Sequence, residues 1–279
     1  MILVNFTNKS EVLTKMLILI VIIILIIKFL AYKMIDNHTH DIEINREEVY
    51  NDKISENLKI LHLSDLHFNF DREYQQELLK IVNNIDYDIL VFTGDYINKK
   101  QYMINLKQFL SKIDNKENAF AVYGNHDYEY NLDKLESIFK ENNINLLNNK
   151  GQVLKIKNNN INIMGVETPD LKKDDFNKAT EGLNLNQNIN IMLSHTYHIL
   201  NRENIDDINL VLAGDTHGGQ INIAFINNII ENKFELKYKS GKYILNNLIL
   251  LINRGIGTSI LPFRINCKPE VLLITLSND

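Results

Sequence analysis

The chain has 279 residues, of which 45% are hydrophobic, and this is enough apolar material for one sizeable domain with its own core. Its formal net charge of -5 and its lack of a dense lysine and arginine block exclude a general nucleic-acid surface, which must neutralise many phosphates. The single cysteine, Cys267, excludes an internal disulfide and a cysteine-based zinc cluster. Any metal ion must therefore be held by histidine, aspartate, asparagine or glutamate.

The first predicted element is the almost wholly apolar segment VLTKMLILIVIIILIIKFLAY at residues 12–32. A helix of about 20 residues spans a hydrocarbon core, and Lys15, Lys28 and Tyr32 suit the two interfaces. We therefore predict an N-terminal segment, residues 1–33, with one transmembrane helix that anchors the chain in a bilayer. A cleaved signal peptide and a buried core helix are the alternatives. With a large domain behind a single anchor, we expect that domain to lie outside the cytoplasm.

Residues 34–57 are polar and acidic with little periodicity, which predicts a tether that includes at most one edge strand. His38 and His40 form a pair in it that could bind a metal ion, although such a pair on a linker is usually only solvated. From residue 58 to residue 279 short apolar runs alternate with amphipathic patterns, and this alternation predicts one α/β domain. The buried strands are expected in LKILHL, DILVFT, NAFAVY, INIMGV, INIMLS and INLVLA, and helices at residues 73–85 and 132–142.

The sequence beyond Ile221 has strand-like segments and few helical signals, which predicts an added antiparallel portion. In layered α/β folds, functional groups gather in the loops at the carboxyl ends of strands. Five such junctions carry polar, metal-capable side chains: Asp65 and His67; Asp95; Asn125, His126 and Asp127; His195; Asp215 and His217. Each alone is typical of a turn or a helix cap, but five in succession indicate one common site.

Carboxylates, imidazoles and an amide oxygen from separate loops make a mixed site that suits Mn, Fe or Zn. Two such ions need one carboxylate that can contact both, and Asp95 is central among the junctions. A metal pair polarises a phosphoryl oxygen and generates hydroxide near neutral pH. The pattern therefore predicts two divalent metal ions and the hydrolysis of a phosphoester.

The order Asp-x-His, Gly-Asp, Gly-Asn-His-Asp, His and Gly-Asp-Thr-His resembles the motif series of the calcineurin-like metallophosphoesterases across residues 58–276. The resemblance implies a four-layer α/β/β/α sandwich with a dinuclear centre at its edge. By position it implies that the first metal is bound by Asp65, His67 and His217, the second by Asn125 and His195, and both by Asp95. It also implies that His126 contacts the phosphoryl group or protonates the leaving oxygen, and that Asp127 orients His126.

One position departs from the family pattern, because Asp215 stands where the family usually has a histidine that binds the second metal. Aspartate can still coordinate, with a preference for Mn or Fe, or it can fall short and weaken the second site. Gly218, Gly219 and Gln220, with the tail NRGIGTSILPFRINCKPE, resemble the membrane-associated phosphodiesterase branch. Arg254 and Arg264 in this tail are therefore candidate phosphate contacts. The alternative is that each arginine anchors a loop to backbone carbonyls.

Two features limit the class of substrate: the predicted membrane anchor, and the absence of an arginine soon after the Gly-Asp motif. Ser/Thr protein phosphatases of this superfamily carry an arginine soon after the Gly-Asp motif, whereas this chain reads GDYINKK. We expect a metal-dependent phosphodiesterase or pyrophosphatase that acts on a phospholipid or a lipid-linked nucleotide sugar. A phosphodiesterase for soluble nucleotides or wall polymers is the alternative enzyme, and a metal-poor binding scaffold on the same fold is the alternative of another class. The sequence gives no signal for a protein partner.

Overall fold

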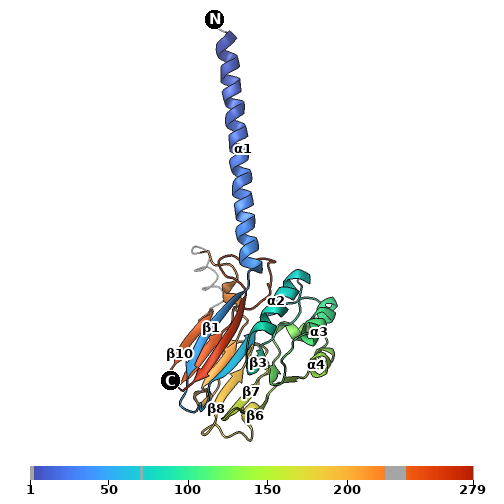
Figure 1. The fold of residues 1–279 in the computed structure, drawn as a ribbon, viewed down its shortest axis with the longest axis vertical. Helices are drawn as coiled ribbons and strands as arrows, with labels where there is room; N and C mark the ends of the chain where they lie inside the picture. The colour runs from blue at the N-terminus through green and yellow to red at the C-terminus, as the bar shows by residue number, and fades with distance from the viewer. Residues whose placement is uncertain (1–2, 70–71, 224–236, 279) are drawn as a thin grey trace.

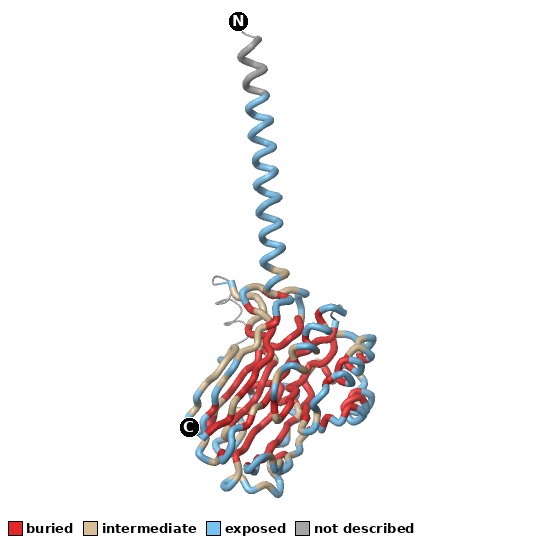
Figure 2. Tube along the Cα trace, viewed as in Figure 1, coloured by how far each residue is buried: buried red, intermediate tan, exposed pale blue. Residues whose placement is uncertain are grey.

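The computed structural model describes residues 3–69, 72–223 and 237–278. Its first element is α1 (Leu3–His40), which projects away from the domain as an extended helix (Figure 1). Within it, Glu11–His40 is long and apolar enough to cross a membrane, as an anchor or a signal sequence would. Its side chains from residue 11 to residue 34 are all exposed, in contrast to the buried strands of the domain (Figure 2). The predicted apolar helix is therefore present and is not part of the core.

Residues 34–57 are more ordered than the predicted tether. The helix continues to His40, and β1 (Glu43–Tyr50) then pairs in parallel with β12 (Glu270–Ser277) along its whole length. Within this region Ile42, Val49 and Ile54 are buried. The segment is polar because β1 lies at the edge of a sheet, where Arg46, Glu48 and Tyr50 are exposed to solvent. The helix thus joins the domain through a strand of the sheet itself.

The domain contains two six-stranded sheets. The first has the order β1-β12-β2-β3-β4-β5, where the new strands are β2 (Leu58–Leu63), β3 (Ile89–Phe92), β4 (Ala119–Ala121) and β5 (Ile144–Leu146). The second has the order β10-β11-β9-β8-β7-β6, with β6 (Lys150–Ile156), β7 (Asn159–Gly165), β8 (Ile189–Leu193), β9 (Leu210–Ala213), β10 (Gly241–Leu245) and β11 (Leu248–Ile252). The antiparallel portion predicted after Ile221 corresponds to the β10–β11 hairpin and to the return of β12 beside β2.

Three apolar layers hold the sheets and helices together. The first lies between one sheet and the helices α2 (Arg72–Asn84), α3 (Met103–Ser111) and α4 (Leu132–Glu141). The second lies between the two sheets, which explains why their central strands are continuous apolar runs. The third covers the outer face of the second sheet with α5 (Phe176–Thr180) and short 3-10 turns. The predicted four-layer α/β/β/α architecture is confirmed.

Strand direction decides where the polar loops lie. β1 starts at Glu43, three residues after the end of α1, and runs away from the helix. Because β1 and β12 are parallel and β2 is antiparallel to β12, the carboxyl end of β2 returns to the helix side, with His62 opposite Leu272. β3 and β4 run parallel to β2. The carboxyl ends of these strands therefore lie at the end of the domain from which α1 projects.

Candidate metal centre

The turns after the strands hold the predicted ligands in an unusual backbone conformation. Five of these residues have φ in the left-handed region: Asp65 (49°), His67 (41°), Asp95 (56°), Asp215 (71°) and His217 (50°). Such a conformation costs a non-glycine residue of order 1 kcal/mol or more and persists only where the surroundings hold it in place. In these turns, residues two apart in the sequence, such as Asp65 and His67, bring their side chains to the same site.

Two glycines in these turns make room for the carboxylates. A Cβ on Gly124 would lie 2.1 Å from Oδ1 of Asp95, and a Cβ on Gly214 would lie 2.3 Å from Oδ2 of Asp65. Neither distance is compatible with a side chain at the glycine. The glycines of the Gly-Asn-His-Asp and second Gly-Asp motifs are therefore required because one loop packs directly against a ligand carried by another.

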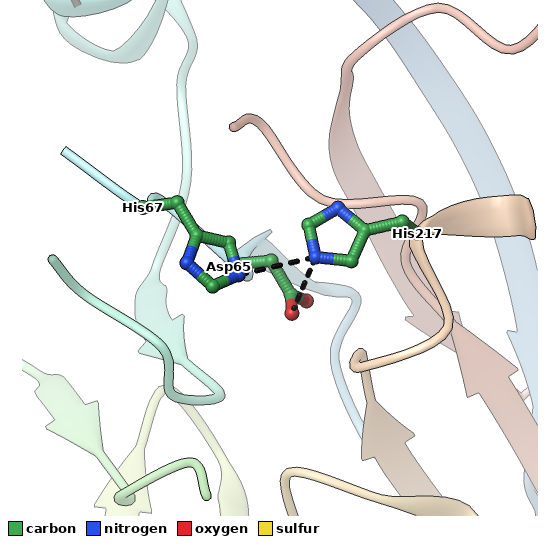
Figure 3. Close-up of side chains that lie close together, drawn as sticks. All are labelled: Asp65, His67 and His217. Carbon is green, nitrogen blue, oxygen red and sulfur yellow. Dashed lines mark hydrogen bonds and ion pairs between the residues drawn. The ribbon is translucent and has the colours of Figure 1, made fainter. Parts of the chain in front are cut away.

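The first cluster brings Asp65, His67 and His217 together (Figure 3). Nε2 of His67 lies 3.1 Å from Nε2 of His217, and the latter lies 3.5 Å from Oδ1 of Asp65. All three side chains are buried, and Oδ1 of Asp65 has no hydrogen-bond partner. Its other oxygen accepts from Oγ of Ser64 at 2.5 Å and from the backbone N–H of Asp215 at 3.0 Å. One carboxylate oxygen is thus held in place while the other faces two imidazoles.

The second cluster is centred on His195. Its Nε2 lies 3.4 Å from Oδ2 of Asp95, 3.4 Å from Oδ1 of Asp215 and 3.1 Å from Oδ1 of Asn125. The same Oδ2 of Asp95 lies 3.4 Å from Nε2 of His67 in the first cluster. One oxygen atom of Asp95 therefore faces both clusters. Asp215, the residue that departs from the family pattern, points into the second one.

The atoms around His195 fit a cation. Its Nδ1 lies 2.6 Å from the backbone carbonyl of Thr93, which can only accept, so Nδ1 carries the proton of the neutral ring. Nε2 then presents a lone pair to carboxylate and amide oxygens that are acceptors as well. Only a proton or a metal ion can make this arrangement attractive. A backbone carbonyl behind the ligating histidine is also the usual way in which proteins fix such a ring on a metal.

The shifted pKa values of the buried side chains also favour a bound cation. Burial raises the pKa of Asp65 to about 7, and burial lowers the pKa of His67 to about 4 and that of His217 well below its usual value. For His195, burial alone would lower the pKa, but the carboxylates of Asp95 and Asp215 raise it well above the usual value. The buried acids and the neutral imidazoles of His67 and His217 form a donor set that suits a divalent ion, and the raised pKa of His195 shows that the carboxylates around it attract positive charge.

His126 lies over the first cluster, with its ring edge-on to that of His67 at 5.5 Å between centroids. The orienting contact predicted for Asp127 is made instead by Glu129, whose Oε1 lies 3.2 Å from Nδ1 of His126. Asp127 is fully buried, and its carboxylate accepts from the backbone N–H groups of Asp95, Tyr96 and Gly124. The prediction failed because residues 126–129 form a 3-10 turn, in which residues three apart share a face.

The two arginines of the C-terminal tail differ: Arg264 anchors a loop to backbone carbonyls, as the alternative interpretation held, whereas Arg254 pairs with carboxylates. Arg254 donates to the carboxylates of Glu270 and Glu43 at 2.9 and 2.8 Å. Arg264 is fully buried and donates to the backbone carbonyls of Arg254, Gly255 and Gly257. Its guanidinium also lies 3.2 Å from Nδ1 of His217. The arginines therefore hold the tail against the metal centre.

Sequence reasoning missed several residues that support the site. Glu129, Ser64 and the carbonyl of Thr93 each contact a candidate catalytic or metal-ligating side chain, as described above. The spacing of three residues between His126 and Glu129 could have indicated the first of these contacts. The contact of Thr93 with His195 joins two sheets across 102 residues, and no local signal announces it.

Comparison with known proteins identifies the family. The family model of the calcineurin-like phosphoesterases matches residues 58–219, which carry all seven predicted metal ligands. The chain belongs to the calcineurin-like phosphoesterases. It is a metal-dependent phosphoesterase, and the cofactors of this fold are two divalent metal ions, for which the two buried clusters supply the ligand atoms.

Bacterial members of this family cover most of the chain. The metallophosphoesterase YkuE of Bacillus subtilis is 28% identical over 227 residues, covering 79% of each chain. A metallophosphoesterase of Aquifex aeolicus is 31% identical and covers 78% of this chain and 85% of its own. The phosphodiesterase YaeI of Escherichia coli is 28% identical, with coverages of 78% and 82%. Among solved structures, the 5'-nucleotidase precursor of Thermus thermophilus shares the fold, with a TM-score of 0.50 and 12% identity over 79% of this chain.

The position of Asp215 leads to a prediction about metal binding. We expect the variant Asp215→Ala to bind one divalent ion tightly and the second at least about tenfold more weakly, because the second cluster loses a charged ligand. Asp215→His should retain both ions. Elemental analysis and calorimetric titration with Mn and Zn measure this, with Asp206→Ala on the exposed surface as the control. Two equally tight ions in Asp215→Ala would show that this carboxylate is not a ligand.

Proposed function

We propose that this phosphoesterase is a dinuclear-metal phosphodiesterase whose substrate lies at a membrane surface. The observation that supports the dinuclear site is the single oxygen of Asp95, which faces His67 on one side and His195 on the other at 3.4 Å each. We assign Asp65, His67, Asp95 and His217 to the first metal. Asp95, Asn125, His195 and Asp215 hold the second. The name of the Escherichia coli relative, a phosphodiesterase, supports a diester rather than a monoester substrate.

The residues around the metals divide the work of the reaction. Two divalent ions bound there supply positive charge to the phosphoryl oxygens and acidify a water molecule. His126 is half exposed above the first cluster, with Nδ1 fixed by Glu129. This leaves Nε2 of His126 free to donate a proton to the leaving oxygen or a hydrogen bond to the phosphoryl group. Asp127 positions His126 indirectly, since it fixes the backbone that carries Asp95 and Gly124.

The place of the site in the fold supports a substrate in or at the bilayer. The carboxyl ends of β2, β3 and β4 lie at the end of the domain from which α1 projects (Figure 1). Asp65, His67, Asp95 and Asn125 lie in the loops that follow these ends. The ligands that follow β8 and β9, namely His195, Asp215 and His217, meet them there. If α1 spans a membrane, the metal centre lies beside the lipid surface. We propose a phospholipid or lipid-linked nucleotide sugar as the substrate class. We also propose that the domain lies outside the cytoplasm, as expected for a single N-terminal anchor.

Proteoliposomes that contain the full chain test the substrate class. We expect the enzyme to hydrolyse a phosphodiester or pyrophosphate lipid in its own bilayer at least about tenfold faster than the same lipid supplied in separate vesicles, because anchoring raises the effective concentration. Asp206→Asn serves as the surface control. Hydrolysis of soluble nucleotide diesters without turnover of lipids in the same bilayer would overturn the proposal and favour the alternative of a soluble or wall-polymer substrate.

A further inference from the structure

The loop that follows the metal centre exposes an apolar surface. We call residues 258–263 (TSILPF) of this loop the lip. In the lip, Ile260 is 91% exposed and Leu261 is 41% exposed. Pro262, the next residue, is exposed as well, and Phe263 is half-buried. Isolated apolar side chains on a surface need no explanation, but three consecutive ones at the tip of a loop indicate an interaction site.

The chain that directly follows the lip is attached to the end of α1. The backbone N–H of Arg264 donates to Oγ1 of Thr39 at 2.9 Å, and that of Asn266 donates to Nδ1 of His38 at 3.1 Å. Pro262 and Thr39 line one small cavity between the loop and the helix. The two histidines of the polar segment are thus explained in part, since His38 is a contact between helix and loop. The lip cannot move far from the helix without losing these bonds.

The lip is also attached to the metal centre. The amide of Gln220 donates to the carbonyls of Leu261 and Phe263 at 2.7 and 3.1 Å, and its oxygen accepts from the N–H of Ser259 at 3.0 Å. Gln220 is three residues beyond His217, a candidate ligand of the first metal. At the other end of the lip, a Cβ on Gly257 would lie 2.7 Å from Cβ of His67. The loop is therefore held beside the segments that carry His67 and His217.

The position along α1 at which the domain begins to cover the helix indicates how far the lip lies from the apolar segment. The side chains of residues 11–34 are exposed, and Ile35 is the first that the domain partly covers. His38 and Thr39, which bind the chain beside the lip, follow the end of the apolar segment at Tyr32 by six and seven residues, or about 9 to 11 Å of helix. We propose that the lip enters the bilayer beside α1, with Ile260 and Leu261 in the lipid, and so delivers membrane substrates directly to the metal centre. This inference rests on the proposed anchoring role of α1.

A fluorescent probe can locate the lip, because the chain has no tryptophan. The full-length variant Ile260→Trp, in vesicles of phosphatidylcholine with brominated acyl chains, should show blue-shifted emission and strong quenching. The control is Ile244→Trp in β10. Ile244 is 72% exposed and pairs with Ile249 at the start of β11, at the opposite end of the sheet from the metal centre, so its probe should stay unquenched.

The outcomes separate this inference from the proposed function. If the chain floats with the vesicles but the probes at residues 260 and 244 behave alike, the lip does not enter the lipid and the inference is wrong, while the anchor stands. If the chain does not float with the vesicles, the anchoring role fails and the inference fails with it. Quenching at residue 260 alone supports the inference whether or not a lipid is hydrolysed.

A charge on the lip provides a second measurement. Ile260→Asp in the full chain should lower the hydrolysis of a diester lipid in vesicles by about tenfold. The reason is that the substitution removes an apolar side chain that the proposal places in the lipid. Hydrolysis of the soluble bis(p-nitrophenyl) phosphate should stay unchanged, since Ile260 touches no candidate ligand. Equal lipid hydrolysis by Ile260→Asp and the wild-type enzyme would contradict the inference.

Discussion

Replacement of Asp95 by asparagine is expected to lower kcat/KM for a phosphodiester by about 10³-fold or more. The physical reason is that Oδ2 of Asp95 faces both clusters, so one substitution weakens both metal positions. The amide keeps the shape of the side chain but removes the negative charge that we propose the two metal ions would share. Elemental analysis of the purified variant should show fewer than two divalent ions per chain.

Asp206→Asn, an exposed aspartate outside the site, provides the matched control for Asp95→Asn and should leave kcat/KM and metal content unchanged. Circular dichroism should show that both variants are folded. An Asp95→Asn enzyme that kept two metal ions and activity within about tenfold of the wild type would refute the bridging role.

Replacement of His126 by alanine is expected to lower kcat by about 10²- to 10⁴-fold while both metal ions stay bound. His126 lies over the first cluster but is held by Glu129 and by its own backbone, whose N–H donates to Oδ1 of Asp95 at 3.0 Å. The substitution therefore removes the proposed proton donor without removing a candidate metal ligand. Diester hydrolysis at saturating substrate, together with elemental analysis, separates these effects.

Two neighbours of His126 distinguish the predicted from the observed contact. Glu129→Gln should lower kcat modestly, because it weakens the carboxylate that holds Nδ1 of His126. Asp127→Asn should instead lower the free energy of unfolding by about 1–3 kcal/mol, since the buried carboxylate accepts three backbone N–H groups and an amide cannot accept them all. Loss of activity in Asp127→Asn with unchanged stability would restore the orienting role first predicted for it.

Much of the fold follows from patterns within single segments. LKILHL and INIMLS are continuous apolar runs because their strands are buried between layers, and the structure places β2 and β8 there. The helix predicted at residues 73–85 corresponds to α2, which buries Tyr74, Leu78 and Val82 at intervals of four. Helix α3 was missed. Its nine residues are short for a periodic signal, and they bury four side chains in one face.

The membership of the candidate site was predictable for a similar reason. Polar residues that follow buried strands must lie at the carboxyl edge of a sheet, and the structure brings together the seven side chains that the sequence placed there. The contacts behind these residues were not predictable. Arg264 reaches His217 across 47 residues, and the pairing of β1 with β12 across the whole chain depends on tertiary packing. The contact of Glu129 with His126 could have been indicated by their spacing of three residues, but the 3-10 turn that makes it is known only from the structure.

Reconstitution of the metal-stripped full chain tests the central claim most directly. The measurement is hydrolysis of bis(p-nitrophenyl) phosphate, beside the corresponding monoester, as Mn, Zn or Fe is added stepwise in separate titrations. We predict that diesterase activity returns with at least one of these metals and saturates at two ions per chain, and that it exceeds the monoesterase activity. Metal content near zero, or two bound ions with no hydrolysis of either substrate or of a lipid diester, would contradict the account and favour a binding scaffold.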